Sequence, residues 1–189
     1  MRLLLATRNA HKLREFERLL PAAEIDPLPD GLPTPVEDGD TYAANALIKA
    51  RAAAAATGRA AIADDSGIEA EALGGAPGVR TARYAGEHAT DGENLAKLAA
   101  SAPPGSRLRY VCAIAHVDPQ GGERVFEGTC EGTVAAQPGG SGGFGYDPLF
   151  VPEDGPGDGR TMAELPDAEK DAISHRGRAA RALWAWLSP

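Results

Sequence analysis

The chain has 189 residues, of which 43% are hydrophobic and 24% are charged, so intrinsic disorder and fibrous classes are excluded. With 27 acidic residues against 19 basic ones the formal net charge is −8, which argues against a general nucleic-acid or membrane-surface binder, since such proteins need a basic face. No stretch reaches the roughly 18 apolar residues that a membrane span requires. The segment Arg2-Leu3-Leu4-Leu5-Ala6 is also too short for the apolar region of a signal peptide. We therefore expect a cytoplasmic protein.

The hydrophobic pattern predicts short strands and amphipathic helices in alternation. Strands are expected over residues 3–6, 25–28 and 60–63, and helices after Asn9 and over residues 41–57, 91–100 and 174–187. Asn9 is a suitable N-cap, as is Asp40 or Thr41 for the second helix, which Gly58 ends. Residues 108–117 and 124–134 predict a hairpin in which Cys112 and Cys130 are reduced core residues. Strand–helix units followed by a long hairpin indicate an α/β fold with a mixed sheet.

The first candidate site is the turn from strand to helix at Thr7-Arg8-Asn9-Ala10-His11-Lys12. A helix N-terminus carries partial positive charge, so cations are unfavourable there. These cations can mark an ordinary solvated helix start, or they can form an anion site together with Asn9 and backbone N–H groups. Because the protein is acidic overall, we favour the anion site.

The second candidate site is acidic. Asp64 and Asp65 are predicted in a turn after a buried strand, at the end of the strand where open α/β sheets place their ligands, and Glu37 precedes the helix that leads into that strand. Adjacent carboxylates in a turn are often only a polar turn, but beside a phosphate site they suit Mg²⁺, which binds one or two carboxylates plus phosphate oxygens. Asn45 and Lys49 lie four residues apart on the intervening helix, where a solvated stripe is the alternative interpretation.

Residues 139–145 form a glycine-rich loop that matches neither a Walker loop nor a dinucleotide fingerprint, which excludes a P-loop NTPase and a Rossmann dehydrogenase. Phe144 within this loop either stacks on a flat ligand such as a purine base or plugs the loop. Near the C-terminus, Ser174, His175 and Arg176 begin the last helix. They form either a surface cap or a cluster of donors that faces an electronegative ligand atom.

Six segments together resemble the inosine/xanthosine triphosphate pyrophosphatases. The segments are TRNAHK, EDGDTYAANALIKA, ADDSG, LGGAPGVRTARYAG, GFGYDPLF and ELPDAEKDAISHR, in this order along nearly the whole chain. The resemblance implies one domain over residues 1–189 with an elongated mixed α/β fold of two lobes, an active site in the cleft between them, and a homodimer. It also implies Mg²⁺-dependent hydrolysis of ITP, dITP and XTP between the α- and β-phosphates. The products are the nucleoside monophosphate and pyrophosphate, so these nucleotides are removed from the pool. The expected binding partner is a small-molecule nucleoside triphosphate, and neither nucleic acid nor a membrane is expected to bind.

The resemblance also assigns site residues. Glu37 and Asp65 would ligate the metal, and Asp65 would also act as the general base. The residues that would bind substrate are Thr7, Arg8, Asn9, Ala10, His11 and Lys12 at the triphosphate, Ser66, and Phe144, Gly145, Tyr146, Asp147, Lys170, His175 and Arg176 at the base. Two positions depart from the family pattern. Ala44 replaces a usual glutamate, and Asp171 replaces a usual asparagine and adds a charge beside Lys170.

Two other functions remain open on the sequence. One is a pyrophosphatase that acts on methylated or pyrimidine nucleotides, which a panel of triphosphates would separate. The other is a nucleotide-binding module without activity, which binding without turnover in Mg²⁺ would support, although such a module has no need of carboxylates at a strand end. Because Mg²⁺ lowers the pKa of a nearby carboxylate, we expect Asp65 to orient the attacking water rather than to deprotonate it unaided.

Overall fold

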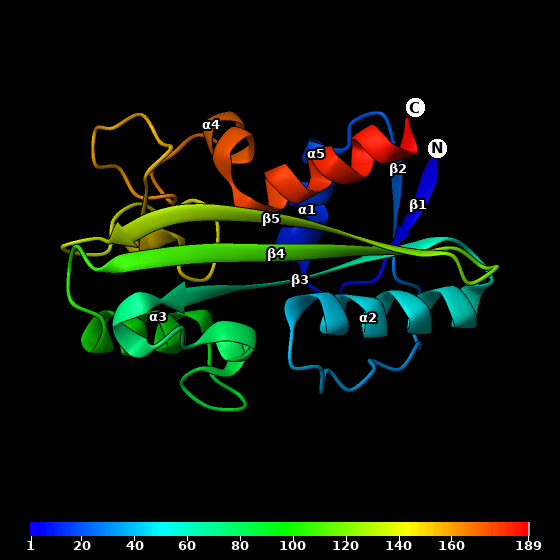
Figure 1. Cartoon of the computed structure of the whole chain (residues 1–189), viewed down its shortest axis with the longest axis horizontal. Coiled ribbons are helices and arrows are strands. Elements are labelled where there is room, and N and C mark those ends of the chain that lie inside the picture. The colour runs from blue at the N-terminus through cyan, green and yellow to red at the C-terminus, as the bar shows by residue number, and fades with distance from the viewer. Residues whose placement is uncertain (189) are drawn as a thin grey trace. The chain divides into compact units, whose positions relative to one another are not determined.

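The structure is a computed structural model that describes residues 1–188. Its strands are β1 (Arg2–Leu5), β2 (Glu24–Pro27), β3 (Ala61–Ala70), β4 (Arg107–Val117), β5 (Glu123–Val134) and β6 (Phe150–Pro152). Its α-helices are α1 (Ala10–Leu19), α2 (Tyr42–Thr57), α3 (Asp91–Ser101), α4 (Asp167–Ile173) and α5 (His175–Leu187), and 3-10 turns cover Glu71–Leu73, Gly78–Arg83 and Asp147–Leu149. The strands form a six-stranded sheet in the order β2-β1-β3-β4-β5-β6 (Figure 1). Because β1 pairs in parallel with β2 and β3 while β5 and β6 are antiparallel, the predicted mixed α/β class is confirmed.

The chain divides into two compact units. The first contains residues 1–65, residues 112–128 and the chain from Arg176 on, and the second contains residues 66–111 and 129–175. Strands β3, β4 and β5 therefore contribute residues to both units. The predicted single domain with an active-site cleft stays a prediction.

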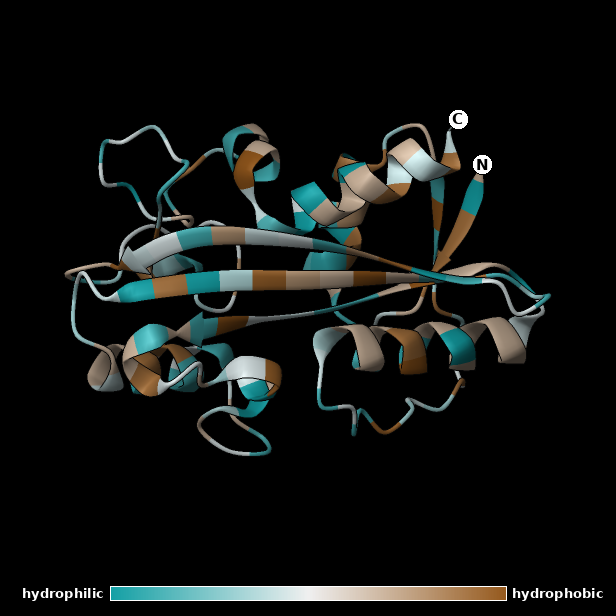
Figure 2. Ribbon diagram, viewed as in Figure 1, coloured by the Kyte–Doolittle hydropathy of each residue, from teal (hydrophilic) through white to brown (hydrophobic). Residues whose placement is uncertain are grey.

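In the first unit, α1 and α5 lie on one face of the sheet and α2 lies on the other (Figure 1). The core on the α1 and α5 side is aliphatic and aromatic; it includes Leu3, Leu5, Phe16, Leu20, Ile62, Ile114, Phe126, Ala179, Ala180 and Leu183. In the second half of β4, residues 112–117 are all buried, and all of them except His116 are hydrophobic (Figure 2). On its inner side α2 buries Ala46, Ala50, Ala53 and Ala54. These small side chains let the helix approach the sheet closely.

Local capping explains where these helices begin and end. The Asn9 side chain accepts hydrogen bonds from the backbone N–H groups of His11 and Lys12, and Gly58, with a φ of 65°, ends α2. Thr41 caps α2 by accepting from the N–H of Ala44. A glutamate at position 44 could complete a capping box, which alanine cannot do. The predicted cap Asn9 and the predicted stop at Gly58 are therefore confirmed, and of the two caps offered for the second helix, Asp40 or Thr41, the helix uses Thr41.

The second unit is built around the other halves of β3, β4 and β5. Its core contains Ile68, Ala70, Leu98, Leu108, Tyr110, Cys130, Val134, Leu149, Phe150, Met162 and Leu165. Helix α4 and strand β6 are elements that the sequence pattern did not predict. Cys112 and Cys130 are both free and buried, as expected. Over residues 1–188, no helix combines the length and apolarity needed to cross a bilayer.

One local prediction was wrong. The segment Asp64-Asp65-Ser66-Gly67 was expected to be a turn, but it lies inside the ten-residue strand β3. Adjacent carboxylates disfavour a strand unless each finds a cation. Both find one here, so the sheet continues through the acidic pair.

Candidate functional site

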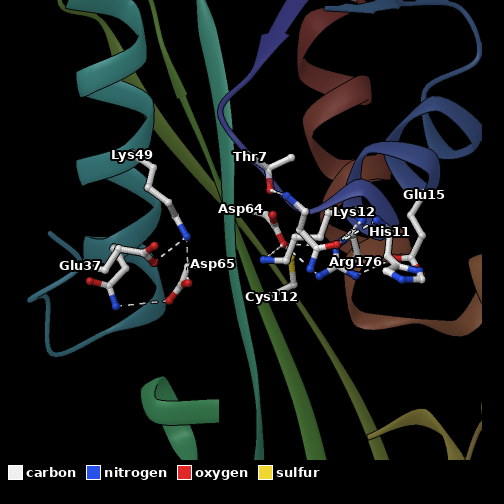
Figure 3. A network of polar contacts seen from close by, with 12 residues as sticks. Thr7, His11, Lys12, Glu15, Glu37, Lys49, Asp64, Asp65, Cys112 and Arg176 are labelled. Atoms are coloured by element: carbon white, nitrogen blue, oxygen red, sulfur yellow. Dashed lines mark hydrogen bonds and ion pairs between the residues drawn. The ribbon is translucent and has the colours of Figure 1, made fainter. Parts of the chain in front are cut away.

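Asp64 and Asp65 face opposite sides of β3, since side chains alternate along a strand. Figure 3 shows Asp65 turned toward α2, where Lys49 and Glu37 lie, and Asp64 turned toward Lys12 and Arg176. Two polar clusters, both in the first unit, therefore share one strand.

The cluster on the α2 side centres on Lys49. Its ammonium donates to Glu37 Oε2 at 2.7 Å and to Asp65 Oδ1 at 3.0 Å. Asn45, one helical turn earlier, donates from Nδ2 to Asp65 Oδ2 at 3.3 Å and accepts from the N–H of Gly39 at 2.8 Å. Asn45 thus ties the segment that carries Glu37 to the strand. The interpretation of Asn45 and Lys49 as a solvated stripe is wrong.

Neither Asn45 nor Lys49 was among the site residues predicted from the sequence. The available signal was their spacing of four on a helix otherwise rich in alanine, because two polar side chains on such a helix need polar partners. What the sequence could not supply was the identity of those partners, which lie 6 to 20 residues away along the chain.

The pKa values in this cluster reflect burial and charge. Burial raises the pKa of Asp65 above its ordinary value, although Lys49 and Lys12 act in the opposite direction and Glu37 adds to the rise. Burial disfavours the charge on Lys49, but the Asp65, Asp64 and Glu37 carboxylates outweigh it, so the pKa of the ammonium is raised. Asp65 is therefore a stronger base than a solvated aspartate.

The donor set on this side suits a hard divalent cation. Glu37 Oε2 and Asp65 Oδ1 converge on one point, since both lie within 3.0 Å of the same ammonium nitrogen. Two carboxylates are enough for Mg²⁺, which commonly completes its coordination with substrate phosphates and water. Among residues 1–188, no group of three or more His, Cys, Asp or Glu side chains is arranged to hold a metal. A metal here would depend on the substrate for its other ligands.

The cluster on the α1 side centres on Asp64, whose side chain is fully buried. Asp64 Oδ2 accepts from Arg176 Nη2 at 2.9 Å and from Nε at 3.1 Å, and it lies 3.1 Å from Lys12 Nζ. Burial favours the neutral acid, but the cations Lys12, Arg176 and Lys49 outweigh it and hold the pKa of Asp64 well below its usual range. Burial and the adjacent Asp64 raise the pKa of the Cys112 thiol to about 12. Near neutral pH, Asp64 is therefore ionised and Cys112 is a neutral thiol.

The predicted phosphate site at the start of α1 is assembled only in part. Thr7 Oγ1 accepts from the N–H of Asn9, and Asn9 Oδ1 accepts from the N–H groups of His11 and Lys12. The Arg8 guanidinium donates to the carbonyl oxygens of Pro29 and Leu32, so it supports a loop. The His11 ring contacts Arg14. Lys12, with 15% of its side chain exposed, is the cation of this segment that joins the Asp64 cluster.

The predicted base-binding residues of the second unit gather around Asp147. Asp147 Oδ2 accepts from Lys170 Nζ at 2.7 Å and from the N–H of Phe144 at 3.0 Å. The Lys170 ammonium lies 5.5 Å from the centre of the half-buried Phe144 ring. A Cβ on Gly143, at a φ of 66°, would lie 2.0 Å from Asp147 Oδ2, so only glycine fits there. The loop therefore depends on one buried carboxylate.

Tyr110 is a further member of this group that the sequence did not suggest. Its hydroxyl donates to Asp147 Oδ1 at 3.1 Å, and its ring stacks on the His175 ring at 4.5 Å and an interplanar angle of 10°. Tyr146 donates from its hydroxyl to the carbonyl of Thr81, and the N–H of Gly145 donates to Asp91. No local motif marks Tyr110, because its contacts come from the strand register.

The structure thus gathers the predicted residues in two places. Lys12, Glu37 and Asp65 lie in the first unit, together with Arg176, whereas the predicted base contacts from Phe144 to His175 lie in the second unit with Ser66. Arg176 was predicted with His175 at the base, but its guanidinium is engaged by Asp64 and by Glu15 Oε2, at 2.5 Å from Nη1. That base contact stays a prediction.

Comparisons with known proteins agree in one family. The model of the Ham1 family matches residues 3–186. A dITP/XTP pyrophosphatase of Cutibacterium acnes is 48% identical over 96% of this chain and 94% of its own length, and one of Symbiobacterium thermophilum is 50% identical over 94% and 90%. The structure of a HAM1 protein from Coxiella burnetii superposes with a TM-score of 0.86 at 40% identity, covering 100% of this chain and 98% of that one. The resemblance found in the sequence is confirmed.

Proposed function

Because the chain belongs to the Ham1 family, we propose that it hydrolyses the deaminated purine nucleoside triphosphates ITP, dITP and XTP to the nucleoside monophosphate and pyrophosphate. The observation that carries the proposal is the pair of clusters on β3: the carboxylate of Asp65, 13% exposed and of raised pKa, lies 3.0 Å from the Lys49 ammonium and also feels the charge of Lys12. Such an arrangement can orient a water molecule and stabilise phosphate charge at the same place. The names of the relatives support two of these substrates, dITP and XTP.

In this proposal Lys12 binds the phosphates and Asp65 orients the attacking water and accepts its proton. The ammonium of Lys49 holds the Asp65 carboxylate in one orientation by its bond to Oδ1, and Asn45 holds the other oxygen. Mg²⁺, held by Glu37 and Asp65 with phosphate oxygens, would supply positive charge where the pyrophosphate leaving group becomes more negative.

The second unit would select the base. Lys170 can only donate hydrogen bonds. It therefore suits the C6 oxygen of hypoxanthine and xanthine and opposes the C6 amino group of adenine. Guanine shares that oxygen, and its C2 amino group would be buried without an acceptor at a cost of about 1–3 kcal/mol. Phe144 offers an apolar ring for stacking.

We also propose that the protein works as a homodimer in the cytoplasm, where the nucleotide pool lies. Light scattering coupled to gel filtration tests the dimer. A monomer at working concentration would contradict that part of the proposal and leave the activity untouched.

The deciding experiment measures pyrophosphate release from ITP, XTP, GTP and ATP at one Mg²⁺ concentration and at none. We expect kcat/KM for ITP and XTP to exceed that for GTP by at least about tenfold, with ATP near or below GTP. Equal values for ITP and GTP would contradict the selection of the base. If methylated or pyrimidine triphosphates are hydrolysed faster than ITP and XTP, they are the substrates instead. If the protein binds these nucleotides without hydrolysing them, it is a nucleotide-binding module and not an enzyme.

A further inference from the structure

Four charged side chains of the first unit are joined by three ion pairs, and helix α1 connects the two ends of this row into a ring. Lys12 and Glu15 lie three residues apart on α1, Asp64 lies on β3, and Arg176 lies at the start of α5 (Figure 3). Lys12 contacts Asp64 at 3.1 Å, Asp64 accepts from Arg176 at 2.9 Å, and Arg176 donates to Glu15 at 2.5 Å. The ring thus begins and ends on α1.

The ring is buried unevenly. The exposed fractions of the side chains are 0% for Asp64, 2% for Arg176 and 7% for Glu15, against 15% for Lys12. Two cations and two carboxylates balance within it. The three interior members alone carry a net charge of −1, which Lys12, the most exposed of the four, neutralises.

A buried ionic network of this kind contributes little net stability compared with well-packed apolar side chains, because desolvating the charges offsets their attraction. It does fix geometry, because each charge is costly to leave unpaired. Arg176 donates from Nε and from Nη2 to one oxygen, Asp64 Oδ2, which holds that oxygen in place, and Glu15 accepts from the third nitrogen, Nη1.

We propose that Glu15 and Arg176 are positioning residues for the phosphate end of the substrate, acting through Asp64 on the ammonium of Lys12. This inference rests on the proposed function in one respect, that Lys12 binds the triphosphate. It gives Arg176 a task at the phosphates, whereas the resemblance places this residue at the base.

The first test removes one charge with almost no change of shape. Glu15→Gln keeps an oxygen acceptor for Arg176 Nη1 but removes one negative charge. Asp64 is then the one carboxylate of the ring that balances Arg176, so its attraction for the Lys12 ammonium weakens. The probe is inorganic tripolyphosphate, which has no base, and its binding is measured by calorimetry. We expect its affinity to fall about tenfold, as when the supporting partner of a ligand-binding group is removed. The ratio of kcat/KM for ITP to that for GTP should change less than about twofold.

The matched control is Glu123→Gln, which removes a carboxylate from an exposed ion pair with Arg51 in the same unit. It should alter neither tripolyphosphate affinity nor base selectivity. A folded Glu15→Gln protein that binds tripolyphosphate as tightly as the wild type would overturn the inference. So would a loss of ITP-over-GTP selectivity as large as the loss of tripolyphosphate affinity.

The wild-type chain supplies a second measurement that does not depend on how the variant folds. With ¹⁵N-labelled arginine, the Nε–H resonance of Arg176 should shift when tripolyphosphate is added and stay in place when inosine is added. A shift on addition of inosine and none on addition of tripolyphosphate would show that Arg176 acts at the base. If the wild type binds tripolyphosphate but releases no pyrophosphate from ITP, the proposed function fails while the positioning role stands. If ITP is hydrolysed while Glu15→Gln binds tripolyphosphate normally, only the positioning role fails.

Discussion

Replacing Lys49 with methionine tests whether Glu37 and Asp65 form a cation site. The ammonium lies 2.7 Å from Glu37 Oε2 and 3.0 Å from Asp65 Oδ1, with exposed side-chain fractions of 12% for Lys49, 31% for Glu37 and 13% for Asp65. At an effective dielectric constant of about 20, each contact is worth about 6 kcal/mol before desolvation. Removing one partner of a fully buried pair costs about 3–5 kcal/mol.

Since Glu37 is about a third exposed, we lower that cost to about 2–4 kcal/mol in the free energy of unfolding. For a chain of this size the melting temperature should fall by roughly 5–15 °C. Methionine fills a similar volume, so most of this loss is electrostatic. The two carboxylates are left facing each other without the cation between them.

Mg²⁺ should then restore part of the stability of Lys49→Met. A ligand at ten times its Kd stabilises the folded state by about 1.4 kcal/mol. The wild type should gain less, because its own ammonium competes for the same two oxygens. The assay is thermal unfolding with MgCl2 or with KCl at equal ionic strength. The matched control is Arg51→Met on the same helix, which breaks an exposed pair with Glu123 and should cost under about 1 kcal/mol. Equal losses in the two variants, or equal Mg²⁺ effects in variant and wild type, would refute the reasoning.

Four further outcomes are expected. Asp65→Asn should keep the fold by circular dichroism and lose turnover roughly a thousandfold; more than a tenth of wild-type turnover would contradict its catalytic role. Lys12→Ala should lower kcat/KM for ITP more than about fivefold, and a smaller loss would place the phosphates elsewhere. Tyr110→Phe removes one hydrogen bond to Asp147 and should reduce the ITP-over-GTP preference about three- to tenfold, with tripolyphosphate binding unchanged; unchanged selectivity would make Tyr110 a packing residue. Since the pKa of Cys112 is raised to about 12, the native thiol should resist iodoacetamide near pH 8 and react on unfolding; rapid alkylation of the native protein would show that Cys112 is accessible.

The sequence was most informative where structure depends on neighbours along the chain. The caps Asn9 and Thr41 and the helix stop at Gly58 were predicted because capping involves residues two to four positions apart. The mixed sheet followed from the order of short apolar runs. The prediction of a turn at Asp64 was wrong because the strand there depends on a residue far along the chain. Arg176, whose guanidinium pairs with Asp64, lies 112 residues away.

The candidate site divides in the same way. Residue types in recognisable strings, such as Glu37 and Asp65, could be selected in advance. The spacing of Lys49 and Asn45 was visible but had a solvated stripe as its ordinary alternative, and Tyr110, a tyrosine in a strand, carried no signal at all. Their place in the site comes from the register of β3 and β4 with the elements around them, which local pattern does not encode.

The alternation of a single strand also explains how two adjacent aspartates can differ in chemistry. Asp64 faces Lys12 and Arg176 and is also acted on by Lys49, so its pKa is lowered, whereas Asp65 shares Lys49 with the carboxylate of Glu37, so burial prevails and its pKa is raised. Neighbouring acids whose environments separate their pKa values in this way commonly divide the work of an active site. Asp64 is suited to fix cations because it stays charged, and Asp65 keeps the basicity that an attacking water requires. A slip of β3 by one residue would turn each carboxylate to the other face of the sheet, so the division of roles depends on the pairing of the strand as much as on the identity of either side chain.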